Sequence, residues 1–407
     1  MAALAHKPRL LVLNQYYWPG VEATAQLLTD LCEALADEYD IRVLTGMLHG
    51  HELLPHRVVR NGVEIVRVHS TAFERSRLGL RGLNYVSYLG ATLVHALSGS
   101  RPDLVLCMTD PPMIGDVGLA VSKRFGVPLL VISEDVFPEI ATKLRRLENP
   151  VLVGVLRQLV RLYLKRADRV VAIGETMRQR LEAKGAPGER LRVIPNWIDT
   201  GSITPREHEN DWKREQRLEG RFVVMHSGNV GHAQDLDTLV RATTFLRDLD
   251  DLTVVIVGFG ARHAEIQSLA ALLETDQVRF LPYQPRAVLP LSLAAGNLHF
   301  VGLARGLSGY VVPSRLYGIL AAGRPVIVSA DADSETAQVV AEVGCGVVLP
   351  PGRPELVARV IRDAHDGKLD LEDMGRKGRE YVIAEADVAV AVGRYRAVLG
   401  ELVGETT

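Results

Sequence analysis

One arginine stands where a cation is electrostatically misplaced, at the start of a predicted helix. The stretch VVPSRLYGILAAGRPVIVS, residues 311–329, has Pro313 and Ser314 at a typical helix start and Gly323 at a typical helix end. Ser314 is the expected N-cap. The amides of a helix N-terminus carry partial positive charge, so Arg315 there is either fully solvated or faces a bound anion. The stretch alone leaves both interpretations open.

Three glycine-bearing loops could bind such an anion, and each follows a short apolar run. They are NQYYWPGVEATA with Gly20, SGNVGHAQDLDTL with Gly228, and VGFGARHAEI with Gly258 and Gly260. Glycine lets backbone amides approach a ligand, although for any single loop the glycines could simply end a strand. Three such loops, together with the Arg315 stretch, favour a diphosphate site that supplies the anion.

The elements that must position these loops are short apolar runs alternating with amphipathic helices. This alternation is typical of α/β domains with parallel, doubly wound sheets, which bind ligands at the carboxyl ends of their strands. A polar stretch interrupts the alternation, which restarts at Phe222. We therefore predict a first Rossmann-like domain over 1–200, a linker over 201–220 and a second Rossmann-like domain over 221–387. Two such strand edges facing each other predict a deep cleft.

Composition narrows the class of protein. The chain has 407 residues, 47% of them hydrophobic and 24% charged, and its net charge of −2 gives no reason to expect nucleic-acid binding. Three scattered cysteines, Cys32, Cys107 and Cys345, lack metal-ligand spacing and indicate buried thiols in a reducing compartment. We see neither a signal peptide nor a membrane-spanning run, and expect a cytoplasmic protein or one on the cytosolic face of a membrane.

An ordered series of motifs carries a family resemblance over nearly the whole chain. The second half contains RLRVIPNWIDT, VMHSGNVG, VIVGFG, VRFLPYQPRAVLPLSLAAGNLHFVGL, PSRLYGILAAGRPVI and VGCGVVLPPGRPELVARVI. It resembles the retaining nucleotide-sugar-dependent glycosyltransferases of the GT4 family, which have the two-domain GT-B fold. In the first half, GVPLLVISEDVFPEIA is similar to a stretch of the bacterial subgroup that builds capsules, O-antigens and exopolysaccharides.

The resemblance implies a nucleotide-sugar donor, most commonly a UDP-sugar in this subgroup, bound by the second domain. It implies no cofactor, and we find no paired-Asp metal motif. It also implies that the last helix, about 388–407, crosses back to the first domain. The expected donor-binding residues are Gly20, Gly228, Asn229, Gly258, Gly260, Pro282, Tyr283, Val312, Ser314, Arg315 and, as a second phosphate cation, Arg305.

The chain departs from the family pattern at the donor site. Two glutamates that many members carry are replaced by Tyr310 and Gly318, and an Arg and a Lys by Asn229 and, approximately, Gln234. Arg315 matches the Lys of a P-S-K variant of the motif. The departures leave three functions open: a transferase of this subgroup, a non-catalytic nucleotide-sugar-binding protein, or a GT-B nucleotide-sugar epimerase.

For the transferase, the resemblance implies retention by same-face attack, with the leaving phosphate helping to take the acceptor proton. Fixed amides, helix dipoles and arginine would stabilise the charge on the leaving diphosphate. Carboxylates of the first domain would orient the acceptor: Asp135 and Glu139 as catalytic candidates, with Asp110 and Glu134 as acceptor-binding ones. The alternative for Asp135 and Glu139 is capping of a helix N-terminus.

Two basic, apolar segments of the first domain point to a membrane. Residues 143–169 carry Arg157, Arg161, Lys165 and Arg166 among Val, Leu and Tyr at helical spacing, and residues 71–93 carry Arg75, Arg77 and Arg81. Basic amphipathic helices bind anionic membrane surfaces, although a sheet-covering helix with a solvated basic face gives the same pattern. Together the segments favour a polyprenyl-diphosphate-linked sugar acceptor.

Overall fold

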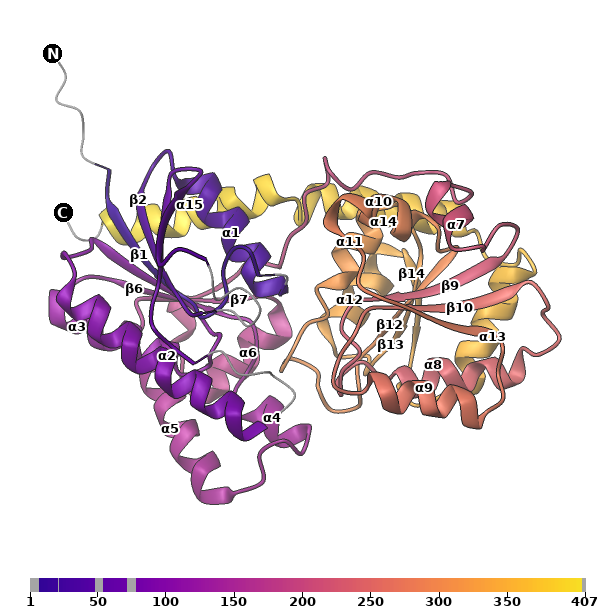
Figure 1. Ribbon diagram of the computed structural model, residues 1–407, viewed down its shortest axis with the longest axis horizontal. Coiled ribbons are helices and arrows are strands. Elements are labelled where there is room, and N and C mark those ends of the chain that lie inside the picture. The colour runs from indigo at the N-terminus through magenta and orange to yellow at the C-terminus, as the bar shows by residue number, and fades with distance from the viewer. Residues whose placement is uncertain (1–6, 21, 48–53, 72–77, 405–407) are drawn as a thin grey trace, which may run out of the picture. The chain divides into compact units, whose positions relative to one another are not determined.

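The computed structural model describes residues 7–20, 22–47, 54–71 and 78–404, and the side chains of these ranges except 78–81 (Figure 1). The chain divides into two compact units, one of Met1–Pro195 with Ala389–Thr407 and one of Asn196–Val388. Each unit is a predominantly parallel sheet with helices on both faces. The α/β, doubly wound architecture predicted from the alternation is therefore confirmed.

The sheet of the first unit has the strand order β3-β4-β2-β1-β5-β6-β7-β8, in which only β3 is antiparallel to its neighbour. The order reverses between β1 and β5, so ligands are expected beyond the carboxyl ends of these two strands. The strands are β1 (Arg9–Leu13), β2 (Asp40–Thr45), β3 (Arg57–Arg60), β4 (Val63–Arg67), β5 (Leu104–Met108), β6 (Leu129–Ser133), β7 (Arg169–Ala172) and β8 (Leu191–Val193).

Helices cover both faces of this sheet. Since crossovers are right-handed and the order reverses at β1, α1 covers one face while α2, α3 and α5 cover the other, as Figure 1 shows. Helix α3 packs against both α2 and α5. The helices are α1 (Ala23–Leu35), α2 (Leu78–Ser98), α3 (Ile114–Phe125), α4 (Glu139–Lys143), α5 (Pro150–Arg166), α6 (Glu175–Lys184), the 3-10 turn η1 (Gly188–Arg190) and α15 (Val388–Gly404).

The second unit is built on a parallel sheet of order β11-β10-β9-β12-β13-β14, which reverses between β9 and β12. Its strands are β9 (Phe222–Ser227), β10 (Leu252–Val257), β11 (Val278–Leu281), β12 (Leu298–Gly302), β13 (Val326–Ser329) and β14 (Gly346–Leu349). Its helices are α7 (Asp211–Glu215), α8 (Leu236–Ala242), η2 (Thr243–Phe245), α9 (His263–Leu272), η3 (Arg286–Val288), α10 (Leu289–Ala294), α11 (Arg315–Ala321), α12 (Glu335–Val343), α13 (Pro354–His365) and α14 (Leu371–Glu385).

The segment predicted as a linker, 201–220, packs on the second unit. Trp212 of α7 is 2% exposed, joins the core under β9, and donates from Nε1 to Gln284 Oε1 at 2.8 Å. Lys213 is also buried, and its Nζ donates to the carbonyl of Arg221 at 2.9 Å. The polar composition of the stretch hides these two anchors, because a single buried Trp gives no periodic signal.

The last helix, α15, belongs to the first unit, as the resemblance implies. Its Glu401 accepts from Arg169 at 3.1 Å and from Arg192 at 3.2 Å, and its Arg396 pairs with Glu38. These contacts connect the last helix to β7, to β8 and to the turn between α1 and β2.

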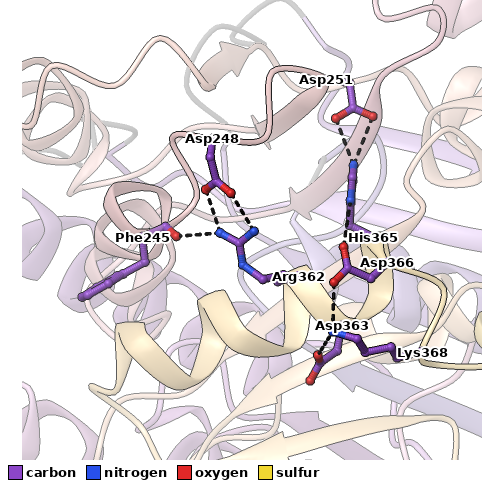
Figure 2. A network of polar contacts seen from close by, with 8 residues as sticks. All are labelled: Phe245, Asp248, Asp251, Arg362, Asp363, His365, Asp366 and Lys368. Carbon is purple, nitrogen blue, oxygen red and sulfur yellow. Dashed lines mark hydrogen bonds and ion pairs between the residues drawn. The ribbon is translucent and has the colours of Figure 1, made fainter.

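Charged side chains anchor the end of α13 to the connection between η2 and β10 (Figure 2). Arg362 donates two hydrogen bonds to Asp248, at 2.7 and 2.8 Å, and a third to the carbonyl of Phe245. His365 contacts Asp251 at 2.9 Å, and Lys368 pairs with Asp363 and Asp366. The bidentate Arg362 pair holds the pKa of Asp248 down, at about 2. This network lies on the outside of the unit and supports α13 rather than the site.

The cysteines are as predicted. Cys32, Cys107 and Cys345 are free and buried, as their scatter predicted. Within the ranges that the structure describes, no helix has both the length and the apolar character needed to span a bilayer.

Candidate functional site: a phosphate-binding edge of the second sheet

The loops after β9 and β10 meet so closely that only glycine fits. Gly228 and Gly258 have φ of 138° and 129°, which side chains rarely adopt, and a Cβ on Gly258 would overlap the carbonyl oxygen of Gly228. The Gly228 amide donates to Val257 at 2.9 Å. At Gly260 a Cβ would overlap the carbonyl of Val230. The glycines therefore let two backbones pack at the carboxyl end of the sheet.

Arg315 lies over this edge and contacts His226, the penultimate residue of β9. Its Nη1 is 3.0 Å from Nδ1 and 3.2 Å from Nε2 of the imidazole. If Nη1 lay in the plane of the ring at nearly equal distances from both nitrogens, it would overlap the ring carbon between them. The guanidinium therefore lies over the face of the ring. A Cβ on Gly228 would lie 4.0 Å from Arg315 Nε. The cation therefore borders the glycine loop.

This pair places an uncompensated positive charge at the edge. Burial lowers the pKa of Arg315 to about 10, so it is still charged at neutral pH. Burial and the nearby Arg315 hold the pKa of His226 well below 6.5, so the imidazole is neutral. Among the described residues no carboxylate pairs with Arg315. A partly buried cation on a neutral partner favours an incoming anion.

The expected N-cap is wrong in its detail. Ser314 occupies the N-cap position of α11 but has helical dihedral angles, φ −62° and ψ −19°, and makes no side-chain cap hydrogen bond. Helix α11 is also only seven residues long. The case for an anion here therefore rests on the Arg315 guanidinium and the glycine loops, since a short helix carries little dipole of its own.

The other predicted donor residues of this unit lie along the same edge. Asn229 follows Gly228, and its carbonyl is 3.3 Å from His226 Nε2. Pro282 and Tyr283 follow β11, and the hydroxyl of the half-exposed Tyr283 donates to the carbonyl of Phe259 at 3.2 Å. Val312 is buried just before α11.

Arg305 has a backbone partner, and its role as a second phosphate cation stays a prediction. Its Nη2 donates to the carbonyl of Pro351 at 3.1 Å, at the turn after β14. Gly20 lies in the first unit, after β1, where its amide closes a turn to Tyr17 at 2.8 Å and a Cβ would crowd Glu22.

Two residues of the edge were missed by sequence reasoning. His226 is one, and its signal was a lone histidine in an apolar strand. The other is Asp235, at φ 48°, whose carboxylate accepts from Thr238 Oγ1 at 2.9 Å, from the Gly352 amide at 3.1 Å and from Ser329 Oγ at 3.2 Å. Asp235 thus ties together the start of α8, the end of β13 and the turn before α13.

In the first unit, the predicted acceptor-binding residues lie at the carboxyl ends of neighbouring strands. The Asp110 carbonyl accepts from the Gln15 amide at 2.8 Å, and its carboxylate accepts from Thr24 Oγ1 at 3.2 Å. The loops after β1 and β5 are thereby joined at the point where the strand order reverses. The Glu134 amide, after β6, donates to Thr109 Oγ1 at 3.0 Å.

The two catalytic candidates differ. The carbonyl of Asp135 accepts from Ser133 Oγ at 3.0 Å, and the catalytic role of its carboxylate stays a prediction. Glu139, in contrast, accepts from Arg157 Nε at 2.9 Å and from Lys184 Nζ, which links α4, α5 and α6. Burial alone would raise the pKa of Glu139, but these two cations outweigh it and hold the pKa below its ordinary value. Glu139 lies in the first turn of α4 and is an ion-pair partner here, and its catalytic role stays a prediction.

A third carboxylate of this unit drew no attention in the sequence. Asp116 lies in the first turn of α3, and its Oδ2 is buried and makes no hydrogen bond within the described residues. Burial raises the pKa of Asp116 to about 7. The described residues contain no cluster of three or more His, Cys, Asp or Glu arranged to hold a metal ion.

Comparisons with known proteins bear on both units. The family model of the "Glycosyl transferase 4-like domain" matches residues 22–197, and that of "Glycosyl transferases group 1" matches residues 208–381. "Probable glycosyltransferase WbjE" of Pseudomonas aeruginosa is 25% identical over 98% of this chain and 99% of its own. "Putative colanic acid biosynthesis glycosyl transferase WcaI" of Escherichia coli K12 is 30% identical over 49% of this chain and 50% of its own.

Solved structures agree on the fold. Sucrose-phosphate synthase from Thermosynechococcus elongatus superposes with a TM-score of 0.80 at 17% identity, covering 98% of this chain and all of its own. Anabaena Alr3699/HepE, solved in complex with UDP and glucose, gives 0.73 at 16% identity, covering 97% of this chain and all of its own. The two matched models, the full-length relative and the shared architecture together show that the chain belongs to the GT4-type glycosyltransferases with the GT-B fold.

Proposed function

We propose that this glycosyltransferase moves a sugar from a UDP-sugar to a polyprenyl-diphosphate-linked sugar during the synthesis of a surface polysaccharide, with retention of the anomeric configuration. One observation carries the donor half of the proposal. Arg315 is a partly buried cation whose described partner, His226, is neutral, and it borders the glycine loop after β9. A diphosphate supplies the missing charge.

The donor chemistry follows from this charge. When the bond between the anomeric carbon and the diphosphate oxygen breaks, negative charge grows on the leaving diphosphate. A fixed guanidinium in a partly dry site stabilises that charge more than water does. The loops around Gly228 and Gly258 bring backbone close to the same place. We expect the reaction to need no metal ion, because Arg315 provides the positive charge.

The nucleotide and the acceptor are suggested by the comparisons. Alr3699/HepE was solved with UDP, which favours uracil as the base. WcaI is named for colanic acid biosynthesis, and WbpZ of Pseudomonas aeruginosa, 28% identical over 56% of this chain, is named a D-rhamnosyltransferase. These names favour a sugar acceptor in polysaccharide assembly, and the basic segment over 143–169 favours one anchored in lipid.

Retention is proposed to occur by attack on the same face of the sugar. The acceptor oxygen forms the new bond to the anomeric carbon as the bond to the diphosphate breaks, and its proton passes to a leaving-phosphate oxygen. Asp135, Asp110 and Glu134 of the first unit are proposed to orient the acceptor. Glu139 is left out of this set, since its carboxylate is held by Arg157 and Lys184.

The test uses the full chain. Thermal shifts with UDP-, GDP- and ADP-sugars identify the donor, and transfer to a lipid-linked sugar is followed by proton NMR of the anomeric signal. We expect stabilisation by one UDP-sugar and a retained configuration in the product. An inverted product would refute retention, and no shift with any nucleotide sugar would refute the donor assignment.

One observation favours a second candidate, a nucleotide-sugar-binding protein without transferase activity. Gly318 and Tyr310 stand where many family members carry glutamate, and neither offers a carboxylate to the donor ribose. Binding of a nucleotide sugar with neither transfer nor hydrolysis would favour this candidate. Conversion of the sugar without acceptor would instead indicate an epimerase.

A further inference from the structure

Helix α5 exposes a continuous row of apolar side chains. This α5 stripe consists of Val151, Leu152, Val155, Leu159 and Leu162, with exposed fractions between 38% for Leu159 and 75% for Val151. At 3.6 residues per turn, all five fall within about 100° of the helix circumference. Gly154 and Gln158 border the stripe and line a shallow hollow with it. A row this long is not the scattered exposure of an ordinary surface.

The remaining faces of α5 show that the stripe is not the sheet-facing side. Val153, Val160, Tyr163 and Leu164 are buried against the unit. The third face carries Arg157, Arg161 and Lys165, spaced every four residues along one flank of the stripe. The helix thus has a buried face, an exposed apolar face and a basic face.

Helix α2 repeats the arrangement. Its α2 stripe consists of Leu83, Val86, Val94 and Leu97, exposed by 37% to 67%, and lies opposite the buried side formed by Asn84, Tyr88, Thr92 and Ala96. Both helices pack on α3 and cover the same face of the first sheet (Figure 1). Of the fifteen large apolar side chains exposed in the described structure, nine belong to these two stripes. The apolar surface of the chain is therefore concentrated here.

The charges around the stripes indicate which kind of partner can bind this apolar surface. From Pro150 to Arg166 the sequence has four cations, and from Leu78 to Ser98 it has one, and neither stretch contains an Asp or Glu. A second copy of this chain would bring cations to cations. The polar headgroups of an anionic bilayer offer the complement, with apolar chains beneath them.

We propose that the α2 and α5 stripes dock on an anionic lipid bilayer, inserted to the boundary between headgroups and acyl chains. Arg161 and Lys165 then contact lipid phosphates while their stems lie along the apolar surface. Arg157 contributes less, since it is engaged with Glu139. The inference rests on the proposed lipid-linked acceptor and adds the surface that brings the enzyme to it. Arg75 and Arg77, also predicted to be basic membrane contacts, lie outside the described residues, as does the side chain of Arg81.

The test compares three variants of the full chain by flotation with vesicles. The stripe variant is V151S/V155S/L159S, the basic variant is R161Q/K165Q, and the matched control is L272S, since Leu272 is 79% exposed on α9 of the second unit. Vesicles contain phosphatidylcholine with or without phosphatidylglycerol, at low and at high salt. All variants are first shown to melt as the wild type does.

We expect the wild type and L272S to float with anionic vesicles, and high salt to weaken but not abolish this. Each surface cation contributes about fivefold, so the basic variant should lose about 25-fold in partitioning at low salt. The stripe variant should lose binding at both salt concentrations. As an independent readout, tryptophan fluorescence of L159W should shift to the blue with vesicles, whereas that of L272W should not.

Absence of flotation by the wild type at low salt would overturn the proposal. So would an equal loss in L272S, or a dimer in sedimentation that the stripe variant dissociates. Transfer to a soluble short-chain acceptor is measured in parallel. If the wild type lacks that transfer, the proposed function fails, whereas failure of flotation with soluble transfer intact refutes only the docking surface.

Discussion

Replacing Arg315 shows whether this cation binds a ligand or stabilises the fold. In most proteins a partly buried arginine pairs with a carboxylate, and its removal destabilises the fold. Here its partner is the face of neutral His226, and burial lowers the pKa of Arg315 to about 10. Because the folded state disfavours the charged form, we expect R315Q without ligand to be at least as stable as the wild type. Any gain should be about 1 kcal/mol, since the side chain is only partly buried.

Binding of UDP should respond in the opposite direction. A charge-assisted hydrogen bond to phosphate contributes about 1.5–3 kcal/mol, so R315Q should weaken UDP binding by roughly 10- to 150-fold in calorimetry. R376Q is the matched control, because Arg376 is an exposed partner of Asp373 and Glu380 on α14, and its UDP dissociation constant should change little. An unchanged UDP dissociation constant in R315Q would remove Arg315 from the site, and an R315Q protein that melts several degrees lower would show that Arg315 stabilises the fold.

Four further changes test other parts of the site. H226F keeps a flat ring under the Arg315 guanidinium and should retain UDP affinity, whereas H226A should bind UDP about tenfold more weakly in calorimetry. Equal UDP affinities of the wild type and H226A would show that His226 does not position Arg315. G318E should preserve or tighten donor binding and raise the melting temperature, because a Cβ at this position meets only Leu293 at 3.7 Å and a glycine inside a helix costs about 0.5–1 kcal/mol. G318A is the control, and loss of donor binding in a folded G318E would show that the ribose lies elsewhere. E139Q should lower the free energy of unfolding by about 1 kcal/mol at pH 7, and because the pKa of Glu139 is lowered in the folded state, the difference from the wild type in denaturant titrations should shrink as the pH falls through that pKa. A difference that does not depend on pH would contradict the ion-pair role. D116N should be more stable than the wild type by about 1–2 kcal/mol at pH 8 but not at pH 4. Burial raises the pKa of Asp116 to about 7, so the folded state is destabilised only as the pH rises above the pKa that Asp116 has in the unfolded chain, and equal melting temperatures at pH 8 would contradict this expectation.

Periodicity was enough to predict the architecture, because short buried strands and amphipathic helices leave separate traces in sequence. It could not reveal the packing of 201–220, where a few buried side chains without helical or strand spacing, among them Trp212 and Lys213, anchor a polar stretch. Glycine positions were informative at the donor edge, since close backbone contact at Gly228 and Gly258 demands that residue type.

Contacts between side chains could not be predicted from the sequence. Nothing in the order of residues indicates that Glu139 meets Lys184, 45 positions away, or that Arg315 rests on a histidine 89 positions earlier. The predicted N-cap of Ser314 is wrong because Ser314 has helical dihedral angles and its side chain makes no cap hydrogen bond. The segments of α2 and α5 were predicted from the sequence to contact a membrane, but which of their apolar side chains are exposed became known only with the buried face of each helix.

Acceptor-dependent release of UDP shows whether Arg315 holds the diphosphate of a donor whose sugar this chain transfers. The wild type and R315Q are incubated with the UDP-sugar that stabilises the wild type, with and without a polyprenyl-diphosphate-linked sugar. We expect the wild type to release UDP only with acceptor, in step with glycosylated lipid, and R315Q to be at least tenfold slower at subsaturating donor. Equal rates for the two proteins, or UDP release that does not depend on the acceptor, would contradict these expectations.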